Sequence, residues 1–292
     1  MGTLIARAAH GREVLPVPLQ IDIPGLEIGA EDTLVDVGCG QGDVCAYAAA
    51  LGAAVIGVDS DPAALAIAEE RLRRLPARSF RTILSDCDPI PLPDASASVV
   101  IATEVLEHVD DPPRFLAELV RVGRPGARYV LSAPDPASEE VMRAVAPGWY
   151  WRRPFHIHVY EHSVLDALVR ESGLEIIGRG ARGFHQSLWW VFRFALGAEV
   201  NEPTPDAALL KHWDAAWTAL GEAPGGLRAA EALDRAIPKS QLILARKGGG
   251  SRYRSVGVKS FGWRSRWKRR LRDGSARLLG FDVRWSVRRS RG

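Results

Sequence analysis

The feature that most constrains this chain is an alternation of short apolar segments with longer helical ones. The short segments are uniformly apolar rather than alternating between apolar and polar residues, as expected of strands that helices cover on both faces. We predict strands at 33–37, 55–58, 81–84, 98–102, 127–132, 174–178 and 240–245. Helices are predicted between them, at 43–51, 62–75, 114–122 and 163–172. The pattern predicts an α/β fold with a doubly wound, mostly parallel sheet.

The predicted helices carry start signals. Asp61 and Asp111 each precede a proline, and an Asp side chain can cap the first N–H groups of a helix whose first residue is Pro. Ser163 and Asp166 are spaced like a capping-box pair, so we expect Ser163 to open its helix.

Charge is distributed unevenly along the 292 residues. The whole chain has a formal net charge of +3, but residues 246–292 hold 16 Lys and Arg against 2 Asp and Glu, so the remainder is acidic. Three cysteines without regular spacing argue against a disulfide scaffold and favour a reducing compartment. With no secretory signal or spanning helix expected, we predict a cytoplasmic protein that can lie peripherally at a membrane.

The domain organisation follows from these patterns. We expect an irregular lead-in over 1–30 and a main domain over 31–247. Helical insertions after the fifth and sixth strands, at 135–160 and 181–237, would form an acceptor lid. The tail at 248–292 mixes basic residues with tryptophans behind a glycine linker, so it can bind a nucleic acid or an anionic membrane, or be a solvated extension.

A glycine-rich loop follows the first predicted strand, in the sequence LVDVGCGQGD at 34–43. Alone, such a loop can be a plain turn between a strand and a helix. A dinucleotide-binding loop reads Gly-x-Gly-x-x-Gly and presents a helix N-terminus to a pyrophosphate. Here Asp43 occupies the third glycine position, and Asp36 precedes the loop. The loop therefore favours a ligand with a cationic amine and no phosphate.

Acidic residues also follow the next strands, and ligands of such sheets bind at the carboxyl ends of the strands. Asp59 can accept hydrogen bonds from both hydroxyls of a ribose, and Asp86 can accept one from an exocyclic amine. The backbone at Cys87 can meet a ring nitrogen. An amine, a ribose and an adenine together describe S-adenosylmethionine.

These segments resemble the class I S-adenosylmethionine-dependent methyltransferases, in the group of small-molecule methyltransferase domains. The resemblance covers about 33–132 and includes LVDVGCGQGD, VIGVDSDPAAL and LSDCDPIPLPDASASVVIATEVLEHVDDPPRFLAELVRVGRPGARYVLSAP. One departure is Ser98, which stands at a structural position where the family often has Asp.

The resemblance implies a Rossmann-like fold and S-adenosylmethionine as the cofactor. The glycine loop would hold the methionine part, Asp59 the ribose, and the residues after the third strand the adenine, with the methyl end beside the fourth strand. The residues that would bind the cofactor are Asp36, Gly38, Cys39, Gly40, Gly42, Asp59, Ser60, Asp86, Cys87, Thr103 and Glu104.

Histidines supply the candidate catalytic groups, because methyl transfer needs a base only when the acceptor must first lose a proton. His108 fits the family phrase EVLEHV, where the alternative is a structural role. His156 and His158 share one face of a segment if it is extended, and the alternative is that they are hydrogen-bonded loop residues. No acidic third ligand stands out beside that pair, so we expect no metal site.

Aromatic residues concentrate in the two insertions and suit an apolar acceptor. We therefore expect an enzyme that transfers a methyl group from S-adenosylmethionine to a small or lipid-like organic acceptor, at oxygen. One alternative is an RNA or protein methyltransferase recruited through the basic tail. A second alternative is a non-catalytic module that only binds the cofactor.

Overall fold

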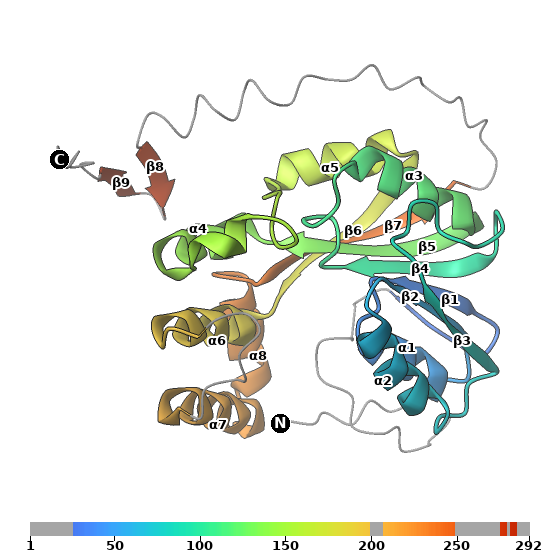
Figure 1. Cartoon of the computed structure of the whole chain (residues 1–292). Helices are drawn as coiled ribbons and strands as arrows, with labels where there is room; N and C mark the ends of the chain where they lie inside the picture. The colour runs from blue at the N-terminus through green and yellow to red at the C-terminus, as the bar shows by residue number, and fades with distance from the viewer. Residues whose placement is uncertain (1–25, 199–206, 249–274, 279–280, 285–292) are drawn as a thin grey trace. The chain divides into compact units, whose positions relative to one another are not determined.

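The computed structural model (Figure 1) describes residues 26–198, 207–248, 275–278 and 281–284. The chain divides into two compact units, Met1–Ser251 and Arg252–Gly292. In the second unit, β8 (Ser275–Leu278) and β9 (Phe281–Arg284) form an antiparallel pair. Most of the predicted lead-in and the rest of the basic tail lie outside the described residues.

A seven-stranded sheet forms the centre of the first unit, in the order β3-β2-β1-β4-β5-β7-β6. Its strands are β1 (Thr33–Val37), β2 (Ala54–Asp59), β3 (Ser79–Leu84), β4 (Ala97–Thr103), β5 (Gly123–Pro134), β6 (Leu174–Arg182) and β7 (Ser240–Lys247). The first five pair in parallel, and β7 runs antiparallel to both β5 and β6. This confirms the Rossmann-like, doubly wound and mostly parallel sheet that the sequence predicts.

Helices cover both faces of the sheet (Figure 1). The buried side chains of α1 (Asp43–Ala50) and α2 (Pro62–Leu72) belong to one hydrophobic core, and those of α3 (Pro112–Val122) and α5 (His162–Glu171) belong to another. The central strands β1, β2, β4 and β5, together with β7, are largely apolar because each contributes buried side chains to both cores.

The insertions after β5 and β6 are helical, as predicted. The first contains α4 (Pro136–Val145) and the short 3-10 helix η2 (Gly148–Trp151). The second contains α6 (Phe184–Ala195), α7 (Ala208–Glu222) and α8 (Gly226–Asp234). Helix α6 packs against α4, α7 and α8, so the two insertions meet each other. No helix among the described residues is long and apolar enough to cross a membrane.

Two of the three predicted helix starts are confirmed. The Asp61 side chain accepts a hydrogen bond from the N–H of Ala63 at the start of α2, and Asp111 caps α3 in the same way. The prediction for Ser163 was wrong. Helix α5 begins one residue earlier, at His162, whose ring hydrogen-bonds Asp135, so Ser163 lies inside the first turn.

Two strands are longer than the apolar segments that predicted them. β5 begins at Gly123 rather than at 127, and β6 continues to Arg182 rather than ending at 178. The reason in β6 is its antiparallel partner, because backbone pairing with β7 continues from Leu174 to Arg182 even where the side chains are exposed.

Candidate functional site

The glycine loop between β1 and α1 has left-handed backbone at Gly38, Gly40 and Gly42, with φ of 74°, 51° and 79°. A Cβ on Gly38 would lie 2.4 Å from Cγ2 of Val105, and one on Gly42 would lie 2.8 Å from Cβ of Ala68. A Cβ on Gly40 would meet no atom of the described residues within 4 Å. Packing therefore explains two of the glycines, whereas Gly40 borders open space that a ligand can approach.

Asp59, the last residue of β2, fixes this loop from the neighbouring strand. Its Oδ2 accepts a hydrogen bond from the N–H of Gly40 at 2.7 Å, and its Oδ1 accepts one from the N–H of Asp61 at 2.9 Å. Each carboxylate oxygen has a second lone pair, so both can still accept from a ribose hydroxyl. Ser60, the next residue, is exposed.

Asp36 lies beneath the loop rather than on its surface, with only 2% of its area exposed. It accepts a hydrogen bond from Sγ of Cys45 at 3.4 Å. Burial raises the pKa of Asp36 to about 7, and the charges of Asp59 and Asp43 raise it further against the opposing Cys45 hydrogen bond. Cys39 is also buried in the loop. Asp36 is therefore a buried carboxyl group beneath the loop, with a raised pKa.

The residues after β3 are less enclosed. Asp86 is exposed, and its Oδ1 accepts a hydrogen bond from the N–H of Asp88 at 3.2 Å. Cys87 has left-handed backbone with φ of 65°, and its N–H donates to Oγ of Ser85 at 3.0 Å. One carboxylate oxygen of Asp86 remains for a further donor.

The end of β4 carries Thr103 and Glu104. Glu104 has left-handed backbone with φ of 58°, its Oε1 accepts a hydrogen bond from Ser132, and its Oε2 pairs with the Lys239 ammonium. Burial alone would raise the pKa of Glu104, but Lys239 and the hydrogen bonds lower it below the usual value. Glu104 is therefore an ionised carboxylate held between β5 and β7.

The loop after β4 is bound to a segment about fifty residues further along the chain. The backbone oxygen of Glu107 accepts hydrogen bonds from the N–H groups of Ile157 and His158, at 2.9 and 3.2 Å. The Tyr160 hydroxyl donates to the backbone oxygen of Leu106 at 2.8 Å. These bonds hold the residues before α5 against the loop after β4, on what we call the acceptor side of the site.

Two of the three predicted catalytic histidines come together there. The rings of His108 and His156 are 5.3 Å apart between centroids. His158 instead donates from Nε2 to the backbone oxygen of Val109 at 2.9 Å and packs against Tyr160. Burial lowers the pKa of His108, with a further contribution from His156, and burial also lowers the pKa of His158.

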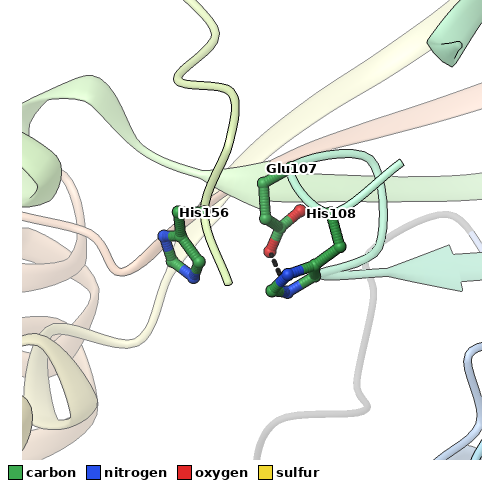
Figure 2. Close-up of side chains that lie close together, drawn as sticks. All are labelled: Glu107, His108 and His156. Carbon is green, nitrogen blue, oxygen red and sulfur yellow. Dashed lines mark ion pairs between the residues drawn. The ribbon is translucent and has the colours of Figure 1, made fainter. Parts of the chain in front are cut away.

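Glu107 lies beside these histidines and was not among the residues predicted from the sequence. Figure 2 shows its carboxylate directed toward the His108 ring, with Oε1 at 3.7 Å from Nε2. The side chain is fully buried, and neither carboxylate oxygen has a hydrogen-bond partner among the described residues. Burial raises the pKa of Glu107, and the negative charge of Glu104 adds to this effect. The signal available in the sequence was its position next to His108.

Glu139, on α4, was missed as well. Its Oε1 accepts a hydrogen bond from the Tyr150 hydroxyl at 2.8 Å, and its Oε2 lies 3.3 Å from Nδ1 of His156. Burial raises the pKa of Tyr150, and the neighbouring Glu139 raises it further, so the tyrosine is a hydrogen-bond donor. Glu139 is therefore fixed by one partner while it orients the imidazole of the other.

Aromatic side chains from the two insertions pack beside this cluster. Phe194 on α6 contacts Trp149, Tyr150 and Trp190, with ring centroids 5.5 to 5.9 Å apart, and the Phe155 ring packs at a tilt against Trp149, with centroids 4.8 Å apart. Tyr150 also contacts the His156 ring, at 4.3 Å. We call these five aromatic residues the aromatic wall. It borders the acceptor side with apolar surface.

Comparison with known proteins identifies a methyltransferase domain within the chain. Residues 35–131 match the model of a family described as a methyltransferase domain. The match spans β1 to β5 and includes the glycine loop and the acids that follow β2, β3 and β4. This match and the curated relatives support a class I S-adenosylmethionine-dependent methyltransferase. S-adenosylmethionine is therefore its cofactor.

Curated relatives support this methyltransferase assignment. The chain is 31% identical over 143 residues to a protein of Mycolicibacterium smegmatis named "Probable S-adenosylmethionine-dependent methyltransferase", covering 49% of this chain and 52% of that protein. It is 30% identical over 162 residues to the ubiquinone biosynthesis O-methyltransferase of Methylococcus capsulatus, covering 52% and 66%. The chain thus spans about half to two thirds of the length of these relatives.

A solved structure shows the same fold. The S-adenosylmethionine-dependent methyltransferase of Methanosarcina mazei superposes with a TM-score of 0.51, covering 77% of this chain and 95% of that chain at 18% identity. At this identity the likeness concerns the fold alone.

The methyltransferase site fits the cofactor in two respects. Gly40 leaves space for close approach to the backbone, and Asp59 keeps lone pairs for hydroxyl donors. All of the predicted cofactor residues lie at or just after the carboxyl ends of β1 to β4. Their individual contacts with S-adenosylmethionine stay predictions.

Proposed function

We propose that this methyltransferase transfers a methyl group to an oxygen atom of a small or lipid-like organic acceptor. The observation that carries the proposal is the aromatic wall beside His156. Aromatic rings bind apolar and planar groups, and a nearby imidazole can take a proton from a hydroxyl.

The chain's main task in such a transfer is to position the acceptor and exclude water. When bound, S-adenosylmethionine supplies a methyl group on a positively charged sulfur. The glycine loop and Asp59 would hold the amino-acid and ribose parts, and Asp86 with the backbone of Cys87 would hold the adenine. Thr103 and Glu104 would then border the methyl end, next to the acceptor side.

A hydroxyl acceptor must lose its proton, and His156 is oriented to take it. The Glu139 carboxylate accepts from Nδ1–H of His156, which leaves Nε2 with its lone pair. The ring of His108 lies beside it, and burial lowers the pKa of His108. Similarity to the O-methyltransferase of Methylococcus capsulatus supports oxygen as the methylated atom.

A second candidate is methylation of RNA or protein recruited through the basic tail, which the charge of residues 246–292 favours. The acidic composition of the remaining chain disfavours direct RNA binding by the catalytic unit. The two candidates differ in whether the tail is needed for methyl transfer.

The test is a transfer assay with radiolabelled S-adenosylmethionine, small phenolic and lipid-like hydroxyl acceptors, total RNA and a protein extract. We expect transfer to a hydroxyl acceptor, and unchanged transfer by a chain that ends at Ser251. Transfer only to RNA or protein, abolished by that truncation, would establish the second candidate instead. Tight cofactor binding without transfer to any class would indicate a non-catalytic module.

A further inference from the structure

Three potential metal ligands meet on the acceptor side (Figure 2). Glu107 and His108 come from the loop after β4, and His156 comes from the segment before α5. One ligand atom from each lies within 4.8 Å of the others. Ligand atoms that share a Zn²⁺ lie about 2.0–2.2 Å from it, and so about 3–4 Å from one another. Side-chain adjustments of about 1 Å would therefore complete the coordination.

Glu107 needs a partner that the described residues do not supply. Both of its carboxylate oxygens are buried and lack a hydrogen-bond partner among those residues. Buried polar groups in native proteins are nearly always partnered, and a buried carboxylate is ionised only when a cation neutralises it. The Lys239 ammonium pairs with Glu104 instead. A metal ion at Glu107 would supply the missing partner.

Both histidines are held in the manner typical of metal ligands. Nδ1 of His108 lies 3.0 Å from the backbone oxygen of Pro154, and because a carbonyl only accepts, Nδ1 carries the proton. Nδ1 of His156 faces the Glu139 carboxylate in the same way. Each Nε2 is then an unprotonated ligand, and a carbonyl or carboxylate behind the ring is the usual outer partner of a metal-binding histidine.

We propose that Glu107, His108 and His156 bind a divalent metal ion on the acceptor side, with Zn²⁺ or Mn²⁺ preferred over Mg²⁺. Two imidazoles and one carboxylate suit transition metals, whereas Mg²⁺ takes oxygen ligands. Three protein ligands leave coordination positions open. This site replaces the sequence-based expectation of no metal.

The use of these open positions rests on the proposed function. An acceptor hydroxyl bound to the metal would lose its proton to bulk water more easily, because the cation stabilises the oxyanion. The metal would then orient the oxygen that receives the methyl group, and His108 and His156 would act as ligands rather than as bases. Metal binding itself requires neither the cofactor nor the acceptor.

The test is calorimetric titration of the full chain, stripped with EDTA, with ZnCl₂, MnCl₂ and MgCl₂ in the absence of S-adenosylmethionine. We expect one Zn²⁺ or Mn²⁺ per chain. Glu107→Gln and His156→Asn should weaken binding by more than about 100-fold, since even the loss of an outer partner weakens metal sites by about 10–100-fold. The matched control is His158→Asn. His158 lies on the same segment as His156, but its ring is hydrogen-bonded to the backbone oxygen of Val109, so this variant should bind the metal as tightly as the wild type does.

A Co²⁺ absorption spectrum of the wild-type chain gives a second readout that needs no variant to fold. Ligand-field bands characteristic of nitrogen and oxygen ligands are expected. Absence of binding, or binding that Glu107→Gln and His156→Asn leave unchanged, would overturn the site. If the metal binds but no hydroxyl acceptor is methylated, the site stands and the proposed function fails. If the chain binds no metal but methylates a hydroxyl acceptor, the proposed function stands and the metal site fails.

Discussion

The site has two parts, a cofactor end at the glycine loop and the acceptor side, and they differ in how a carboxylate is hydrogen-bonded. At the cofactor end, Asp59 accepts hydrogen bonds from the N–H groups of Gly40 and Asp61. At the acceptor side, Glu107 is fully buried and neither oxygen has a hydrogen-bond partner among the described residues. A carboxylate bound to its own backbone keeps its geometry without a ligand, whereas an unpartnered one is unfavourable until a proton or cation joins it. The carboxylate of Asp59 thus has its partners in the unliganded chain, whereas the carboxylate of Glu107 needs a bound proton or cation.

The largest effect is expected at the glycine loop, where two substitutions separate packing from ligand approach. Gly38→Ala should lower the free energy of unfolding by about 3–4 kcal/mol, because left-handed backbone disfavours a Cβ and the Cβ would collide with Val105. Gly40→Ala introduces the same backbone strain but no collision, so it should lower the free energy of unfolding by only about 1 kcal/mol. Urea unfolding followed by circular dichroism measures both.

The matched Gly40→Ala variant should show its main effect in cofactor titration, as weaker binding of S-adenosylmethionine. Equal losses of stability in the two variants would contradict the assignment of Gly38 to packing. Unchanged cofactor affinity in Gly40→Ala would contradict the view that this residue faces the ligand.

The next effect is a pH dependence of stability that arises at Asp36. In the folded chain Asp36 holds its proton up to a pKa of about 7, whereas in the unfolded chain it ionises near its ordinary value of 3.8. The stabilising contribution is therefore complete below about pH 4 and is lost as the pH rises to about 7. Relative to Asp36→Asn, the wild type should lose about 2–3 kcal/mol between pH 5 and pH 7.

Urea unfolding of both cofactor-free proteins at several pH values measures this difference. Other titrating groups are common to the two proteins, so they cancel in the comparison. Parallel curves for wild type and Asp36→Asn would show that Asp36 is ionised in the folded state at acidic pH.

The sequence predicted the cofactor end because that end is built from contiguous patterns. The apolar segment of β1, the glycines and Asp43 lie within about ten residues, and their spacing alone argued against a phosphate ligand. Asp59 ends the apolar strand β2 and Asp86 follows β3, which places both acids at the carboxyl edge of a parallel sheet.

The acceptor side could not be predicted in this way. Glu107, Glu139 and His156 come from three segments. Backbone hydrogen bonds from Ile157 and His158 join the first to the third, and the His156 ring contacts Glu139; no periodicity encodes these contacts. Glu107 follows β4 in a turn, and its backbone oxygen accepts hydrogen bonds from the later segment. For the same reason His156 and His158 were treated as a pair, although the structure separates their hydrogen-bond partners.

A smaller effect is expected at Asp59, and it tests whether the cofactor end is really prepared for a ribose. Asp59→Ala should weaken S-adenosylmethionine binding by about 2 kcal/mol, or about 30-fold, the scale of hydrogen bonds to a charged group. Calorimetric titration measures it, and Asp61→Ala, which removes only the cap of α2, is the control. Equal affinity in wild type and Asp59→Ala would overturn the ribose assignment.

The smallest effect is expected on the acceptor side, at the hydroxyl that Tyr150 donates to Glu139. Tyr150→Phe should lower the free energy of unfolding by about 1 kcal/mol, the usual value for one hydrogen bond, and should lower kcat because His156 loses its fixed orienting partner. The control is Tyr129→Phe, since that buried hydroxyl makes only a 3.4 Å contact with Val120. A loss of stability without a change in kcat would show that the Tyr150 hydroxyl supports packing alone and that His156 acts without it.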